Sequence, residues 1–129
     1  QRNHIKSIEA AYRSSPFYEY YFDDIIPLYE KQYSFLLDLN SDILRVIIKW
    51  LKLNNEISRT TGFEKTGNFV DKRNTIHPKI SQSLSIESLN SAAYIQGFEQ
   101  RHGFIPNLSV LDLVFNIGSE ATSYLKKLG

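Results

Sequence analysis

The strongest periodic pattern in the sequence lies in residues 34–53. Its polar residues form one narrow stripe at spacings of four, three, four and three, and apolar residues fill most of the remaining circumference. The stripe consists of Asp38, Asp42, Arg45, Lys49 and Lys52. This distribution predicts a helix that is buried on more than half of its circumference. We therefore expect one long helix at the centre of the domain.

Shorter helices are predicted on the N-terminal side of this one. Residues 4–13 repeat apolar side chains at helical spacing. Ser15-Pro16 supplies an N-cap and a first-turn proline for a short helix over residues 17–21. A further helix is expected to begin at Asp23 or Asp24. Pro27 then falls in its first turn, where a missing N–H costs little.

The C-terminal block predicts two more helices. Ser109 and Asp112 fit a capping box that opens a short apolar helix, and Gly118 ends it. Ser119 then begins a last helix through Leu128. Between residues 54 and 91 the pattern weakens, and short strands are predicted at residues 56–61 and 94–98.

These elements indicate a mixed α+β fold that is mostly helical. The chain has 129 residues, which is enough for one domain with a real core and too few for two ordinary ones. We expect a single compact domain over residues 1–129. The chain contains no methionine and begins within a helical pattern. We therefore expect it to lack upstream residues, although a processed chain would look the same.

Composition excludes several classes of protein. The net charge is +1 and the cations are spread along the chain, so no nucleic-acid-binding face is indicated. The absence of cysteine excludes disulfides, thiolate nucleophiles and Cys-ligated zinc. No apolar run is long enough to span a bilayer, which indicates a cytoplasmic protein without membrane insertion.

No known catalytic motif is present. The three histidines, His4, His77 and His102, lack metal-site spacing, and no phosphate-binding loop or nucleophile elbow occurs. We therefore predict neither a metal nor a cofactor.

Tyrosines are abundant in the first quarter of the chain. Such rings would line a carbohydrate cleft or, alternatively, form a core wall with polar tips at the surface. They are Tyr12, Tyr18, Tyr20, Tyr21, Tyr29 and Tyr33.

Residues Gly103–Gly118, GFIPNLSVLDLVFNIG, resemble the C-terminal signature of the WbqC-like family. Tyr94-Ile95-Gln96 resembles the Y-x-Q that precedes that signature. Residues 4–12 together with Ser15-Pro16-Phe17-Tyr18 resemble the family's H-x-x-x-I-x-x-A-Y motif and the turn after it. The family's opening motif, roughly Q-P-x-Y-x-P-W-x-G-Y-F, is absent. Its variant D-x-R element is kept as Asp71-Lys72-Arg73.

The resemblance implies a role in surface-polysaccharide biosynthesis of the O-antigen type. A glycine, aminoacyl or other acyl transferase acting on a sugar or nucleotide-sugar is the enzyme class it suggests. It also implies a mixed α/β fold whose strands lie mainly in the absent N-terminal part and in the middle of the chain. The alternative function is a non-catalytic module that binds a glycan or a protein through its tyrosine-rich face.

Candidate site residues follow from the residues and from the family motifs. His102, in a predicted loop, and the motif residue His4 are candidates for the general base. Arg73 would hold a carboxylate or phosphate with Asp71, unless the two form a loop salt bridge. Asn107 is a turn former or a ligand-facing amide, and Asp112 a capping acid or a buried carboxylate of the site. The remaining candidates for substrate binding are the motif residues Tyr12, Tyr94 and Gln96.

Overall fold

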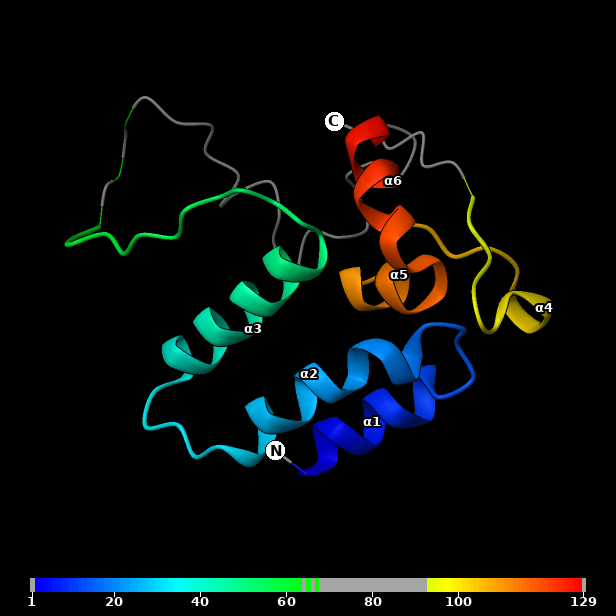
Figure 1. Cartoon of the computed structure of the whole chain (residues 1–129), viewed down its shortest axis with the longest axis horizontal. Coiled ribbons are helices and arrows are strands. Elements are labelled where there is room, and N and C mark those ends of the chain that lie inside the picture. The colour runs from blue at the N-terminus through cyan, green and yellow to red at the C-terminus, as the bar shows by residue number, and fades with distance from the viewer. Residues whose placement is uncertain (1, 64, 66, 68–92, 129) are drawn as a thin grey trace. The chain divides into compact units, whose positions relative to one another are not determined.

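The computed structural model describes residues 2–63, 65, 67 and 93–128. The chain divides into two compact units, one of residues 1–54 and 91–129 and one of residues 55–90. The described residues of the second unit, 55–63, 65 and 67, form no helix or strand. All described helices belong to the first unit (Figure 1). They are α1 (Arg2–Tyr12), α2 (Tyr18–Glu30), α3 (Leu36–Trp50), α4 (Glu99–His102), α5 (Val110–Ile117), the 3₁₀ helix η2 (Gly118–Glu120) and α6 (Ala121–Leu128).

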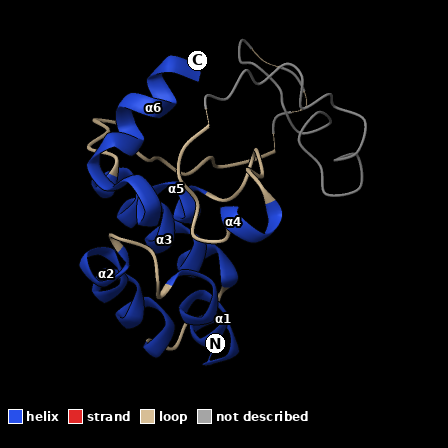
Figure 2. Cartoon of the chain, turned by 90° about the vertical axis from the view of Figure 1, so that its right-hand side faces the viewer, coloured by secondary structure: helices blue, strands red, loops and turns tan. Residues whose placement is uncertain are grey.

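The predicted α+β class is wrong for the described part of the chain, which contains helices and loops and no strand (Figure 2). The two expected strands, at 56–61 and 94–98, are irregular. The backbone of the second segment has other partners. The carbonyl of Gln96 accepts from the N–H of Glu99 in a turn, and the Gln96 side chain binds the backbone of Ile105. Gln96 thus uses its carbonyl and its side chain in a turn and in a loop contact, and not in a pairing with a neighbouring strand.

A single helix, α2, replaces the two helices expected over residues 17–30. Pro27 lies inside it and not in a first turn. A proline there removes one backbone bond, the bond that the carbonyl of Asp23 would accept. Asp23 is exposed, so water can take the place of the missing donor. This lowers the cost of keeping the helix continuous.

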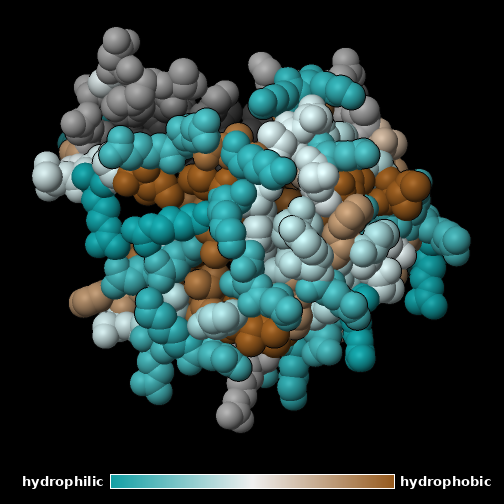
Figure 3. Space-filling model, in the orientation of Figure 1, coloured by the Kyte–Doolittle hydropathy of each residue, from teal (hydrophilic) through white to brown (hydrophobic). Residues whose placement is uncertain are grey.

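Helix α3 lies within the expected range of 34–53, but it is not the buried centre. Among its residues only Trp50 is buried, while Leu36 and Leu37 are 70% and 60% exposed. Val46, Ile47 and Trp50 face the other helices around a small apolar cavity. No described element covers the outer leucines, and apolar side chains reach the surface among hydrophilic ones in Figure 3.

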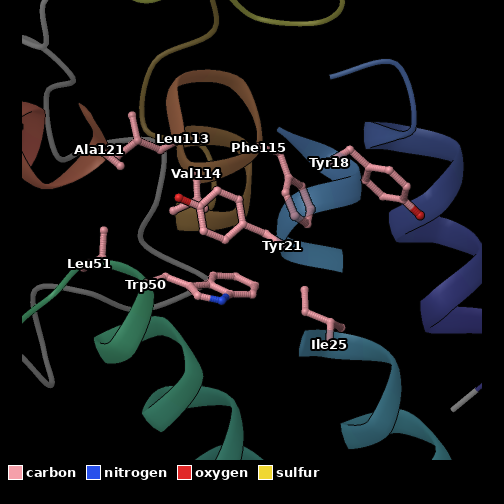
Figure 4. Close-up of a cluster of buried hydrophobic side chains, with 9 residues drawn as sticks. All are labelled: Tyr18, Tyr21, Ile25, Trp50, Leu51, Leu113, Val114, Phe115 and Ala121. Atoms are coloured by element: carbon pink, nitrogen blue, oxygen red, sulfur yellow. The ribbon is translucent and has the colours of Figure 1, made fainter. Parts of the chain in front are cut away.

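The buried centre is α5. Phe115 is completely buried, and its ring lies 5.2 Å from Tyr12, 5.5 Å from Tyr18 and 6.3 Å from Trp50, centroid to centroid. Figure 4 shows the core side chains of α2, α3, α5 and α6 around it. Tyr18 and Tyr21, two of the clustered tyrosines, belong to this core. The rings of these two residues therefore form part of a core wall, although the hydroxyl of Tyr18 is buried and does not reach the surface as expected.

Two contacts fix the ends of α3 and α5. The Oγ1 of Thr122 on α6 donates to the carbonyl of Leu51, 2.7 Å away, just after α3. The N–H of Phe17 donates to the carbonyl of Phe115 at 3.0 Å, which holds the turn between α1 and α2 against α5. The helices of this unit are thus tied to one another through α5 and α6.

Candidate functional site

A group of polar side chains meets where the loop before α4 passes α5. Its centre is Asp112, in the first turn of α5, which is only 5% exposed. The Tyr94 hydroxyl donates to Asp112 Oδ2 at 2.6 Å, and Gln96 Nε2 donates to the same oxygen at 3.3 Å. We call Tyr94, Gln96 and Asp112 the carboxylate cluster.

The second oxygen of Asp112, Oδ1, accepts no hydrogen bond from the described residues. No lysine, arginine or histidine of the described part forms an ion pair with this carboxylate either. A buried carboxylate with neutral donors on one side only is costly to retain, because its charge is poorly solvated. Asp112 therefore has one oxygen held by two neutral donors and one that accepts no hydrogen bond from the described residues.

Ser109 confirms half of the predicted capping box. Its side chain accepts a hydrogen bond from the N–H of Leu111 at the start of α5. Asp112 does not return the bond to Ser109, and its carboxylate accepts from Tyr94 and Gln96 instead. Of the two readings of Asp112, the buried carboxylate is the one that the structure supports.

Gln96 holds the loop in front of α5. Its Oε1 accepts from the Ile105 N–H at 2.8 Å, and its Nε2 donates to the Ile105 carbonyl at 2.8 Å. The amide thus acts as a backbone partner for Ile105 and fixes the segment that leads to Pro106. Tyr94 is held by the rings of Phe104 and Tyr124, both edge-on, at 5.5 and 5.3 Å. These contacts place the Tyr94 hydroxyl and the Gln96 amide at Asp112.

The phenols near Asp112 are hard to ionise. Burial raises the pKa of Tyr94 above its ordinary value, and the hydrogen bond to Asp112 raises it further. Burial also raises the pKa of Tyr12, and the nearby charge of Asp112 adds to this. Tyr12 is thus the fourth predicted residue in this neighbourhood, although no hydrogen bond joins it to the cluster in the described part of the chain.

The raised pKa of Tyr94 predicts a pH dependence of stability. The unfolded phenol titrates near pH 10, and the folded chain holds this proton more tightly. The contribution of this phenol to the wild-type free energy of unfolding should therefore be complete below pH 10 and fall as the pH rises above it. In Tyr94→Phe the free energy of unfolding should decrease less steeply above pH 10, by up to about 1.4 kcal/mol per pH unit. Urea unfolding between pH 8 and 11 measures both slopes, and equal slopes would contradict the assignment.

The other predicted residues lie outside the carboxylate cluster. His102 ends α4 and is exposed, and no hydrogen bond links its ring to the cluster among the described residues. His4 is exposed on α1, with its ring 6.0 Å from that of Tyr29. Asn107 is exposed with a φ of 58°, a left-handed conformation that asparagine tolerates, so its geometry is that of a turn former. Asp71 and Arg73 lie outside the described residues.

Tyr29 also lines a groove of about 590 Å³ between α1 and α2, in the same unit. The groove has an apolar side formed by Ile5 and Ile26, and charged residues of both signs line it as well. His4 thus lies beside this groove and not in the carboxylate cluster. The described residues contain no group of three or more histidines or acidic residues placed to hold a metal ion.

Sequence reasoning missed Asn116 as a member of the site. It lies one helical turn after Asp112, it is buried, and its Nδ2 donates to the Asp112 carbonyl at 2.8 Å. A signal was present, since a polar residue four positions after Asp112 in an otherwise apolar helix lies on the same face.

The sequence matches the WbqC-like protein family over residues 1–99. The chain belongs to this family. The match covers α1, α2, α3 and the Tyr94-Ile95-Gln96 segment, and it ends before the 103–118 block that resembles the family's signature. Family membership therefore rests on the part of the chain that contains Tyr94 and Gln96 but not Asp112.

The chain is also similar to the uncharacterized protein Rv1507c of Mycobacterium tuberculosis. The two sequences are 21% identical over an alignment of 145 positions. This alignment covers 95% of this chain and 63% of the mycobacterial protein. The chain thus spans less than two thirds of that relative. No solved structure matches the chain. In the described part of this WbqC-like chain, no helix has the length and apolar character needed to cross a bilayer.

Proposed function

We propose that this WbqC-like chain takes part in surface-polysaccharide biosynthesis, as a transferase that moves an acyl or aminoacyl group to a sugar or nucleotide-sugar. The single observation that carries the proposal is the Asp112 carboxylate, which is buried, has no cationic partner among the described residues and is held through one oxygen only. Family membership supports it. The chain would act in the cytoplasm, where activated sugars and acyl donors are present.

In this proposal Asp112 binds the acceptor. Tyr94 and Gln96 fix Oδ2 by donating to it, so that Oδ1 points to one place. A carboxylate oxygen accepts strongly from an ammonium or a hydroxyl, and it does so more strongly where water is excluded. Holding the acceptor in one orientation supplies much of the rate enhancement of such a transfer.

The donor is an activated acyl or aminoacyl ester or thioester. The acceptor's hydroxyl oxygen, or the nitrogen of its neutral amine once the ammonium has lost one proton to solvent, attacks the donor's carbonyl carbon, and a new C–O or C–N bond forms. The bond to the leaving group breaks and its electron pair departs with that group. Asp112 accepts the acceptor's proton and returns it to the leaving group. This role was expected of His102 or His4, and the location of Asp112 makes it the better candidate.

Mass spectrometry of reaction mixtures tests the proposal. The chain is incubated with glucosamine or UDP-glucose as acceptor and with acetyl-coenzyme A or a glycyl thioester as donor. We expect an acylated sugar, and we expect Asp112→Asn to lower its rate of formation at least a hundredfold. Substitution of one positioned proton-transfer group typically costs about 10²–10⁴-fold.

A matched control is Asp24→Asn. Asp24 also accepts a hydrogen bond from a side-chain donor, the Trp50 Nε1 at 2.8 Å, and it lies on α2 away from the carboxylate cluster. This variant should keep the wild-type rate. The proposal is wrong if no donor–acceptor pair gives product and the wild-type chain binds none of the acceptors.

A further inference from the structure

A second polar location adjoins the carboxylate cluster at Gly97. A side chain at position 97 would begin 3.6 Å from Ser15 Oγ, 3.9 Å from Asn116 Oδ1 and 3.9 Å from Ser14 Oγ. Because residue 97 is glycine, no side chain enters the space that these three oxygens border. We call Ser14, Ser15, Gly97 and Asn116 the Gly97 corner.

Two of these oxygens have no hydrogen-bond partner among the described residues. The Ser15 hydroxyl is buried and makes no hydrogen bond, and Asn116 Oδ1 accepts none from the described residues. A buried hydroxyl without a partner costs about 1–3 kcal/mol, so such groups are rare. The bond from Asn116 Nδ2 to the Asp112 carbonyl fixes the orientation of the amide, so that Oδ1 is the atom left over.

We propose that the Gly97 corner binds a hydroxyl group of a neutral sugar ring. One alcohol can accept a hydrogen bond from the Ser15 hydroxyl and donate one to Asn116 Oδ1, which satisfies both atoms at once. A fully ionised phosphate only accepts, so it would leave Asn116 Oδ1 unsatisfied, and an ammonium only donates, so it would leave the proton of the Ser15 hydroxyl without an acceptor. The corner is uncharged, which also favours an alcohol over an ion.

The Gly97 corner and the carboxylate cluster are close enough to each other for one sugar ring to contact both. Asn116 and Asp112 lie four residues apart on α5, about 6 Å along the helix axis. A sugar ring with its substituents covers a comparable span. The hydroxyl at the corner would thus orient the ring, while the neighbouring amino or hydroxyl group reaches Asp112. The inference rests on the proposed function, because it assigns the second contact of the same acceptor.

The test is an NMR titration of the isotope-labelled chain with glucosamine, and with UDP-glucose as a second probe. We expect the amide signals of Ser14, Ser15 and Gly97 and the side-chain signal of Asn116 to shift on addition of sugar. Gly97→Ala should weaken binding at least tenfold, because the new methyl group enters the corner. The fold should tolerate it, since the methyl would meet its neighbours at 3.6 Å or more.

Two further variants keep the result decisive. Ser15→Ala removes the buried hydroxyl without adding bulk and should also weaken binding at least tenfold. Gly62→Ala adds the same methyl group at an open position and should bind as the wild type does. The inference is overturned if the NMR signals of the Gly97 corner do not shift on addition of sugar, which is the result expected when only water occupies the corner. It is also overturned if Gly97→Ala and Ser15→Ala bind the sugar as the wild type does.

The two proposals fail in different ways. Sugar-induced shifts at Asp112 and Tyr94, with the corner variants unaffected, would overturn the corner and leave the transferase proposal standing. Absence of any sugar binding by the wild-type chain, together with absence of transfer, would overturn both. Loss of binding in Gly97→Ala and Ser15→Ala, with both variants folded by their amide spectra, supports the corner directly.

Discussion

Phe115→Ala is expected to lower the free energy of unfolding by about 3–5 kcal/mol, the usual cost of truncating a buried phenylalanine. The ring is completely buried on α5 and contacts aromatic rings from three other segments, those of Tyr12, Tyr18 and Trp50. Because large rings surround it, the site cannot collapse without moving α1, α2 and α3. The cavity left behind should therefore remain open.

Urea unfolding followed by circular dichroism measures this loss. The control is Phe35→Ala, since Phe35 is 69% exposed at the start of α3 and its truncation should change the free energy by less than about 0.5 kcal/mol. Equal effects of the two substitutions would mean that α5 is not the centre of the unit.

Gly118→Ala is expected to have the second-largest effect on stability. Gly118 ends α5 with a φ of 56° and a ψ of −126°, a conformation that side chains disfavour at a cost of about 1–3 kcal/mol. A side chain there would also begin 2.8 Å from the ring of Phe17, which adds about 1–3 kcal/mol of overpacking. The backbone cannot relax freely, because the Phe17 N–H is bonded to the Phe115 carbonyl.

A second-site variant separates these two costs. In Phe17→Ala the ring is absent, so adding Gly118→Ala to that background should incur the backbone cost and little else. Urea unfolding of the two single variants and the double variant gives the coupling energy. If Gly118→Ala is as costly without Phe17 as with it, the contact with that ring contributes nothing.

The helices were predictable where one face of a helix meets the core. The pattern of residues 4–13 predicted α1, and the cap at Ser109 and the break at Gly118 predicted α5. The burial of α3 was overestimated, because a pattern of apolar residues does not say how many neighbours a helix has. The two strands were predicted where the helical pattern weakens, and a segment without helical periodicity can equally be an irregular loop.

The candidate site was predictable in part, because some of its residues belong to recognisable motifs. Tyr94, Gln96 and Asp112 were named from motifs, and they do meet in one cluster. Their partners could not be predicted, since residues 96 and 112 approach through the loop at Ile105 and not through regular spacing. Asn116 could have been found from its spacing to Asp112, whereas Ser15 was taken as a helix cap and its burial is visible only in the structure.

The most direct test of the account is to measure stability and sugar binding for Asp112→Asn in the same preparation. Asparagine keeps an oxygen that can accept from Tyr94 and Gln96, and it removes a buried charge that has no cationic partner in the described part of the chain. If Asp112 is retained for a ligand, the free energy of unfolding should stay within about 1 kcal/mol of the wild type. Binding of glucosamine should be lost in the same variant. A loss of stability well beyond that value, with glucosamine binding unchanged, would contradict the account.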